Sequence, residues 1–235
     1  MKNVNKIWIC FLAITGMLLL PNCQKDEDND TSATPEIVMG EDVTDIDGNV
    51  YHTVIIGTQQ WMVENLKTTK FNDGNNIPTE NDNEAWILLT TPGYCWYNDG
   101  EYYKETYGAL YNWYAVNTGK LAPEGWHVPG VNEWKTLINY LGGENAASIK
   151  LREMGTKHWN FPNKESTNEV GFTALPGGYR NAYGCEEMGE ICYFWSTQSS
   201  TYLILNNYNY VSIWTPWVDA NCIGLSVRCI KDQKR

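Results

Sequence analysis

The chain has 235 residues and a formal net charge of −11, with 28 Asp and Glu residues against 17 Lys and Arg. A chain this acidic is repelled by the phosphate backbone of nucleic acids, and no basic patch offsets the repulsion, so nucleic-acid binding is excluded. Hydrophobic residues make up 43% of the chain, enough to bury the core of one domain. The aromatic residues comprise 11 Trp and 15 Tyr against 5 Phe, so most aromatic rings carry a polar group.

The N-terminus has the pattern of an export signal. Two lysines precede an apolar run over residues 7–20. That run is too short for a membrane-spanning helix, which needs about 20 apolar residues. Leu20 lies three residues before Cys23, which resembles a bacterial lipoprotein box, with Asn22 where a small residue is usual. The sequence therefore predicts a lipoprotein signal peptide over residues 1–22 and lipidation of Cys23; the alternative is a secretory peptide with an incidental cysteine.

A lysine and a run of carboxylates follow the cysteine, over residues 25–30, and resemble the surface-export signal of Bacteroidetes lipoproteins. Such a run cannot bury apolar area and stays solvated. We therefore expect residues 23–42 to be a lipidated, flexible acidic tether. The predicted location is the outer membrane, with the protein exposed at the cell surface and in contact with the membrane through its lipid anchor only.

The folded part of the chain begins with β-structure. Residues 50–56 are rich in β-branched and aromatic side chains, and after a glycine residues 60–66 predict a second strand. The segment 72–100 is rich in Asn, Asp, Pro and Gly, which indicates loops. Helical spacing follows: a short helix over residues 110–117, a clearer one over 131–141, and a weaker one over 147–154.

The last part of the chain returns to β-structure. Short apolar or aromatic runs occur at residues 172–175, 193–197, 202–205, 208–214 and 225–230. Strands, then helices, then strands are typical of an α+β domain rather than of alternating βαβ units. We therefore expect one domain over residues 43–232.

Eight blocks of sequence carry a family resemblance. They lie at residues 45–51, 60–66, 95–98, 107–113, 125–129, 171–180, 194–196 and 226–229. Together and in this order they resemble the Fibrobacter succinogenes major paralogous domain. Members of that family are typically surface or secreted proteins.

This family is in turn distantly similar to the formylglycine-generating enzyme fold, a variant of the C-type lectin-like fold, through residues 127–134, 177–180 and 227–229. The resemblance implies two or three short helices, irregular antiparallel sheets and long loops that form a ligand surface. The enzymes of that fold hold copper with a close pair of cysteines upstream of the final Arg-Cys block. The only nearby cysteine before Cys229 is Cys222, and a second cysteine at that spacing is absent, so we expect a non-catalytic protein without a cofactor.

The cysteines downstream of Cys23 are disulfide candidates in an oxidising envelope. Cys185 and Cys192 flank a Glu-rich loop that a local bridge would close, and Cys229 would then pair with Cys222 or with Cys95. Five cysteines follow Cys23, an odd number, so at least one thiol stays free or pairs with another chain.

The sequence gives little support for a metal site built on histidines or for a calcium site. The three histidines have no metal-ligand partners at helical or hairpin spacing, and His127 is interpreted as a structural, hydrogen-bonded residue. Calcium sites are conceivable at residues 45–49 and 72–76. Calcium needs six to eight oxygens, however, and both segments are more simply turns built on an Asp or Asn side chain.

Aromatic and polar side chains mix in several loop-like segments. Aromatic rings stack on sugar faces while neighbouring polar groups bind hydroxyls, which favours binding of an extracellular glycan or protein at a lectin-like surface. Tryptophans inside predicted strands or helices, such as Trp61 and Trp134, are assigned to the core instead. The alternatives are a structural or assembly component of the envelope and, less favoured, a divergent formylglycine-generating-type enzyme. The candidate ligand-binding residues are Trp96, Tyr97, Asn98, Asp99, Tyr208, Tyr210, Trp214, Trp217, Asp219 and Asn221.

Overall fold

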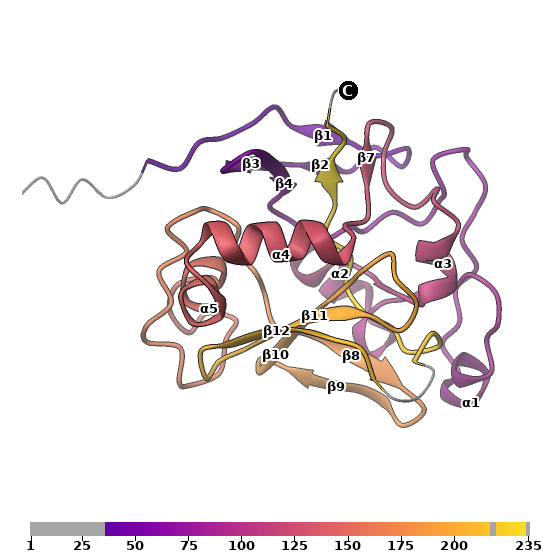
Figure 1. Ribbon diagram of the computed structural model, residues 1–235. Coiled ribbons are helices and arrows are strands. Elements are labelled where there is room, and N and C mark those ends of the chain that lie inside the picture. The colour runs from indigo at the N-terminus through magenta and orange to yellow at the C-terminus, as the bar shows by residue number, and fades with distance from the viewer. Residues whose placement is uncertain (1–35, 217–219, 234–235) are drawn as a thin grey trace, which may run out of the picture. The chain divides into compact units, whose positions relative to one another are not determined.

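The computed structural model describes residues 36–216 and 220–233 (Figure 1). The predicted signal peptide, the lipidation site Cys23 and most of the tether lie outside these residues. The last part of the predicted tether is not a free linker. Ile55 N donates to Val38 O at 2.8 Å, and Gly40 N donates to Thr53 O at 2.9 Å, so this segment runs beside the first strand of the domain.

Four short antiparallel strands form the first sheet. In spatial order they are β3 (Thr53–Ile56), β4 (Gln59–Met62), β13 (Ile230–Lys231) and β7 (Trp126–His127). Ile230 pairs with Trp61 on one side and with His127 on the other. The C-terminal strand therefore joins the N-terminal hairpin to the middle of the chain.

A continuous meander of three antiparallel strands forms the second sheet: β10 (Ile191–Trp195), β11 (Tyr202–Asn206) and β12 (Tyr210–Trp214). Alternate residues of these strands point inward, and Phe194, Leu203, Leu205 and Val211 are almost fully buried. This alternation is what a half-buried sheet requires.

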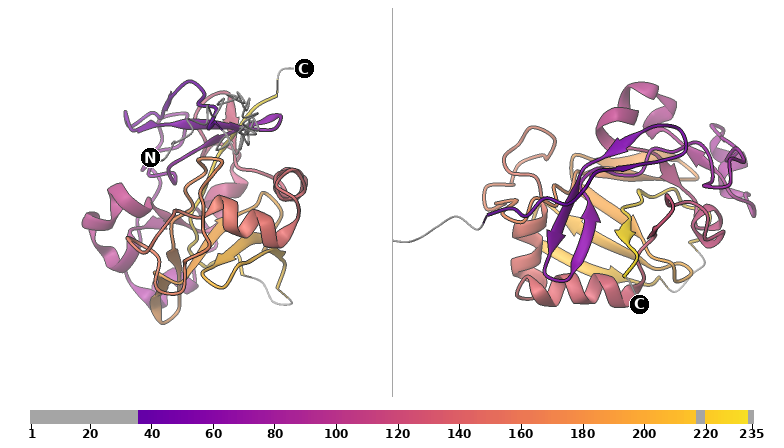
Figure 2. Two further views of the ribbon diagram at one scale, coloured as in Figure 1. Left: turned by 90° about the vertical axis from the view of Figure 1, so that its left-hand side faces the viewer. Right: turned by 90° about the horizontal axis from the view of Figure 1, so that it is seen from above.

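Helix α4 (Val131–Tyr140) runs alongside the two sheets (Figures 1 and 2). Its N-terminus is fixed by Glu133, whose carboxylate accepts from the Gly130 backbone N–H at 2.7 Å. Its buried face places the Trp134 ring 4.7 Å from Trp61 and 5.8 Å from Phe194, measured between ring centroids. The right-hand view of Figure 2 shows the strands of the first sheet crossing over those of the second. Helix α5 (Glu144–Leu151) packs against β12.

The rings of Trp61, Trp134 and Phe194 belong to one large apolar core. A second large apolar core lies beside it and is built from short elements. The elements that surround it or border the candidate site are β1 (Val43–Thr44), β2 (Val50–Tyr51), α1 (Asn83–Ile87), β5 (Tyr94–Cys95), β6 (Leu110–Tyr111), α2 (Lys104–Tyr107), α3 (Trp113–Asn117), β8 (Gly177–Asn181), β9 (Gly184–Met188) and the 3-10 turns η1 (Tyr97–Asp99) and η2 (Glu101–Tyr103). Many of these elements are only two to five residues long. Tertiary packing rather than local propensity therefore fixes them.

Buried arginines connect the loops to the sheets. Arg228 is 1% exposed, donates to Asn65 Oδ1 at 2.7 Å and to Phe172 O at 2.6 Å, and lies 4.6 Å above the Phe172 ring. Burial lowers the pKa of Arg228 to about 10, which leaves the group cationic at neutral pH. Arg152 is fully buried and binds Ser148 O at 3.0 Å and Asn206 O at 2.7 Å. These contacts satisfy carbonyl groups in helix α5, at the end of β11 and in the irregular segment at Phe172.

The architecture confirms the predicted α+β class, with several small antiparallel sheets and short helices. The helix predicted over residues 131–141 is present almost as predicted. The strand predicted at 172–175 is wrong: it is reduced to one bridge between Ala174 and Arg152. The predicted Glu-rich loop is instead strand β9, paired with β8 in a hairpin. Within the described residues, no helix has the length and hydrophobicity needed to cross a membrane.

Candidate functional site

A polar hollow of about 260 Å³ lies between the turn η1 and the β8–β9 hairpin. Its lining comes from three distant segments of the chain, which the small core around Trp86 and Cys95 holds together. The lining residues are Asn83, Asn98, Asp99, Arg180, Tyr183, Gly184 and Cys185. Side chains with amide, carboxylate and guanidinium groups dominate this list, which makes the hollow strongly polar.

Arg180 organises the hollow from beneath. Its side chain is 1% exposed, and its Nη atoms donate to Asp99 Oδ1 at 2.6 Å and to Asn83 Oδ1 at 2.7 Å. The guanidinium also lies 5.2 Å from the centre of the Trp86 ring. Burial alone would lower the pKa of Arg180, but the neighbouring Cys95 and Asp99 outweigh it and raise that pKa, so the group stays cationic. A buried cation thus fixes the orientation of two polar side chains whose other atoms border the hollow.

The turn η1 contributes an unusual backbone. Asn98 has a φ of 48° and Asp99 a φ of 56°, both in the left-handed region. Asn and Asp tolerate this region better than other non-glycine residues, which explains the choice of residues here. The Arg180–Asp99 contact holds the second residue in place. Backbone of this kind persists where its surroundings determine it, and such positions concentrate at functional sites.

An exposed aromatic ring stands at the edge of the hollow. Tyr183 occupies the turn of the β8–β9 hairpin and is 87% exposed. The predicted candidates Trp96 and Tyr97, by contrast, are 8% and 7% exposed. Trp96 packs into the second large core and Tyr97 into the small core around Trp86, so both rings offer little surface to a ligand. Asn98 and Asp99, from the same predicted cluster, do line the hollow.

Two thiols meet at the wall of the hollow. Cys95 is fully buried on β5, and Cys185 is partly exposed on β9. A hydrogen bond from the Cys95 thiol is the main cause that lowers the pKa of Cys185 to about 7, against the opposing effect of burial. Burial, together with that same hydrogen bond, raises the pKa of Cys95 well above its usual value. The Asn98 backbone N–H also donates to Cys185 Sγ at 3.3 Å.

The predicted disulfide bonds are not formed, since no two of the described cysteines are at disulfide distance. The predicted local bridge fails because its two cysteines face different cores: Cys192 packs between the two sheets, and Cys185 packs beside Trp86. Cys229 lies in the second large core, away from both, so its predicted bridges to Cys95 and Cys222 are also absent.

The remaining predicted ligand residues do not form one surface. Tyr208, at the β11–β12 turn, is 73% exposed and borders a hollow of about 270 Å³ with Glu165 and Asn209. Tyr210 and Trp214 begin and end β12 and are each 43% exposed. Asn221 is buried, and its side-chain oxygen accepts from the Ser200 backbone at 3.0 Å, so it supports a loop. Trp217 and Asp219 lie outside the described residues.

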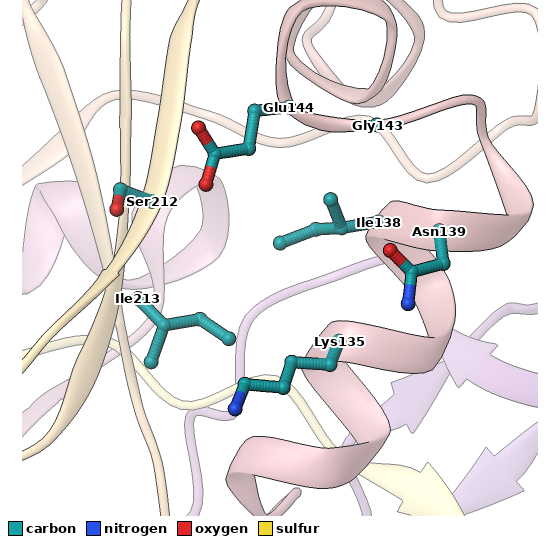
Figure 3. A pocket seen from close by; sticks show the side chains of 7 residues that line it. All are labelled: Lys135, Ile138, Asn139, Gly143, Glu144, Ser212 and Ile213. Atoms are coloured by element: carbon teal, nitrogen blue, oxygen red, sulfur yellow. The ribbon is translucent and has the colours of Figure 1, made fainter.

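Another hollow, about 350 Å³, lies between α4, α5 and β12 (Figure 3). Ile138 and Ile213 point toward each other across it, with the Lys135 amine and the Glu144 carboxylate at its sides. Asn139 and Ser212 add polar groups, but no buried charged side chain like Arg180 lines this hollow, so it is a weaker candidate than the one around Arg180.

The two segments considered for calcium are turns. The Asp45 carboxylate accepts from the backbone of Asp47 and Asn49 at 2.9 Å and from the Tyr51 hydroxyl at 2.6 Å. Asp73 accepts from Asn75 N at 3.1 Å and pairs with Lys120. Their oxygens are thus committed to hydrogen bonds, as expected for turns capped by Asp side chains. Among the described residues no group of three His, Cys, Asp or Glu side chains could hold a metal ion.

His127 is held between two carboxylates. Its Nε2 lies 2.7 Å from Glu133 Oε1, and its Nδ1 lies 2.6 Å from Asp232 Oδ1. The hydrogen bond to Glu133 is the main cause that raises the pKa of His127, burial opposes it, and Asp232 adds to the increase. These contacts join β7, α4 and the C-terminal residues, which agrees with the structural interpretation of this histidine.

Sequence reasoning missed Arg180, Asn83 and Tyr183 as site residues. Arg180 lies at the end of a block used for the family resemblance, and that position was the available signal. The sequence carries no signal for Asn83 and Tyr183, because they reach the hollow only through the tertiary packing of α1 and the hairpin.

Comparison with known families places residues 54–231 in a single family, described as the Fibrobacter succinogenes major domain. No curated protein and no solved structure matches the chain. The matched region contains every residue of the hollow around Arg180 and most of the two sheets, and it covers more than half of the chain. The chain therefore belongs to the Fibrobacter succinogenes major domain family.

Proposed function

We propose that the protein is a lipid-anchored protein of the cell surface whose domain binds an extracellular glycan in the hollow around Arg180. It acts by binding rather than by catalysis. The anchor is Cys23, and the acidic segment after it leads to the domain. A glycan is favoured over a protein partner because the hollow is small, concave and polar rather than broad and apolar.

The observation that carries this proposal is the preset group of polar side chains next to an exposed ring. Arg180 fixes Asp99 and Asn83 through hydrogen bonds of 2.6 and 2.7 Å, so these side chains lose little conformational freedom when a ligand binds. Neighbouring sugar hydroxyls both donate and accept, and they match a carboxylate beside an amide. The Asp99 side chain is 37% exposed and can accept from them.

Tyr183 supplies the second half of the recognition. A tyrosine ring offers an apolar face to the C–H groups of a sugar ring and a hydroxyl to its edge. The ring is 87% exposed and so is available without rearrangement of the hairpin. Polar contacts on one side and an aromatic face on the other would orient a single sugar unit in a hollow of this size.

Binding of the full chain to a glycan array, followed by affinity measurements on the best glycan, tests the proposal. Tyr183→Ala should weaken binding at least about tenfold while the free energy of unfolding changes by less than about 0.5 kcal/mol. Tyr102→Ala is the matched control, because Tyr102 is 88% exposed but does not line the hollow.

A third variant separates the two hollows that carry exposed tyrosines. Tyr208→Ala changes only the hollow beside Glu165 and should leave glycan affinity unchanged. If Tyr208→Ala abolishes binding and Tyr183→Ala does not, the site is wrongly placed. Binding to protein surfaces but to no glycan would reject the ligand class.

A further inference from the structure

Two cysteines that are 90 positions apart in the sequence meet in one small core of the fold. Cys95 is the second residue of β5, and Cys185 is the second residue of β9. Both belong to the small core around Trp86, with Cys185 at its edge and Cys95 inside it. Each thiol affects the pKa of the other, which marks the two sulfurs as neighbours.

The surroundings give the two thiols different properties. Cys185 borders the open hollow, and its sulfur is surrounded by groups that stabilise a negative charge: the Cys95 thiol, the Asn98 N–H at 3.3 Å and the guanidinium of Arg180. Despite the opposing effect of burial, these groups lower its pKa to about 7, so a large share is thiolate at neutral pH. Cys95 has no exposed surface, and burial raises its pKa.

Two other cysteines of the described fold, Cys192 and Cys229, differ from this pair. Cys192 and Cys229 are at most 1% exposed, and burial raises the pKa of each. Neither borders the hollow around Arg180. An exposed, thiolate-forming sulfur backed by a buried second thiol is the arrangement that thiol–disulfide exchange requires.

We propose that Cys185 and Cys95 form a thiol–disulfide exchange site, in which Cys185 attacks a small aliphatic disulfide and Cys95 completes the exchange as an internal Cys95–Cys185 bond. The exchange depends on the two sulfurs and their neighbours and does not rest on the proposed glycan binding, although Cys185 lines the same hollow.

The exchange proceeds in two balanced steps. The Cys185 thiolate attacks one sulfur of the disulfide RSSR, forms a Cys185–SR mixed disulfide and expels one RS⁻. Cys95 then loses its proton to water, and its thiolate attacks the Cys185 sulfur, forming the internal bond and expelling the second RS⁻. The two protons released by the cysteines convert both RS⁻ ions to RSH. Two protein thiols are thus oxidised, and one RSSR is reduced to two RSH.

Bond formation would also act on the hollow. Cys95 directly precedes the segment that leads into η1, and Cys185 lies on the hairpin wall. A covalent link between them fixes the distance between the two walls, which in the thiol form are joined by hydrogen bonds such as that from Asn98 N to Cys185 Sγ.

The test uses the reduced full-length chain and oxidised glutathione, with N-ethylmaleimide to stop the reaction and mass spectrometry to map the sulfurs. Trypsin leaves residues 181–228 as one peptide that holds Cys185, Cys192 and Cys222. A Glu-specific protease must therefore be added, which cuts after Glu186 and isolates Cys185. The expected product is a cross-link between the Cys185 peptide and the peptide that holds Cys95.

Variants establish the order of the steps. Cys95→Ala should stop at a stable glutathione adduct on Cys185, and Cys185→Ala should leave Cys95 unmodified for at least about ten times longer than in the parent chain. Cys192→Ala, which changes a buried cysteine outside the pair, should react like the parent chain. The parent chain alone also decides the question if a variant fails to fold. A cross-link to any other cysteine, or none after full oxidation, would overturn the proposal.

Discussion

Gly178→Ala tests whether the β8–β9 hairpin has the tight geometry that places Tyr183 and Cys185 beside the hollow. Gly178 has a φ of +62°, and an alanine Cβ built there would lie 2.1 Å from Glu186 O and 2.8 Å from Met188 N. Both atoms belong to the backbone of the partner strand and cannot rotate away. On that strand Glu187 also has a φ of +62°, so the pairing is locally distorted on both sides.

The magnitude follows from two costs. A side chain in the left-handed region costs about 1–2 kcal/mol. To relieve the overlap, β9 must also move by about 1 Å, which breaks or weakens about two backbone hydrogen bonds of about 1 kcal/mol each. Gly178→Ala should therefore lower the free energy of unfolding by about 3 kcal/mol or more.

Gly48→Ala is the control, because Gly48 has a φ of +85° but nothing within 4 Å of the added Cβ. It carries the backbone cost alone and should lower the free energy of unfolding by about 1–2 kcal/mol. Urea unfolding followed by tryptophan fluorescence measures both variants, and an unchanged denaturant slope shows that the comparison is valid. If Gly178→Ala is no more destabilising than Gly48→Ala, the close approach of the two strands is wrong.

Two further predictions concern His127, which lies between two carboxylates, and the lipid anchor. His127→Gln should lower the melting temperature more at about pH 5.5 than at about pH 8.5, because Glu133, opposed by burial and aided by Asp232, raises the pKa of His127 in the folded state. The stabilisation of the fold by protonated His127 is complete below the ordinary histidine pKa of 6.5 and is lost as the pH rises through the pKa of His127 in the folded state. An equal decrease in melting temperature at both pH values would contradict this prediction. Cys23→Ala should move the protein from the membrane fraction to the soluble fraction and abolish labelling with radioactive palmitate. Retention in the membrane fraction would argue against lipidation.

Local patterns sufficed for the parts of the fold in which neighbours in sequence are also neighbours in space. The helix over Val131–Tyr140 was predicted because Trp134, Leu137 and Ile138 repeat at helical spacing, and the structure buries these same three residues. The strands β10, β11 and β12 were predicted approximately, as the apolar or aromatic runs at residues 193–197, 202–205 and 208–214. In both cases the local sequence of the element itself carries the signal.

The same reasoning failed where a segment is fixed by distant parts of the chain. Residues 172–175 have the composition of a strand, but Phe172 packs under the guanidinium of Arg228 and its carbonyl accepts from that side chain. A buried arginine thus takes the place of a partner strand. Residues 184–188 read as a polar loop because no position of β9 is fully buried, although its backbone pairs with β8. Hydrophobic periodicity cannot detect a strand with no buried face.

The candidate site depends on contacts of this second kind. Arg180 reaches Asp99 and Asn83 across separations of 81 and 97 residues, and the thiols of Cys95 and Cys185 are similarly remote in sequence. No spacing rule could pair these residues, which is why the sequence predicted a close bridge between Cys185 and Cys192 instead. What the sequence does contain is a single constraint that all these contacts share: Arg180 must be buried with its charge, and a buried guanidinium needs acceptors on every side. Two of the residues that accept from it, Asp99 and Asn83, line the hollow, so the stability of the buried cation and the arrangement of these proposed binding groups arise from the same contacts.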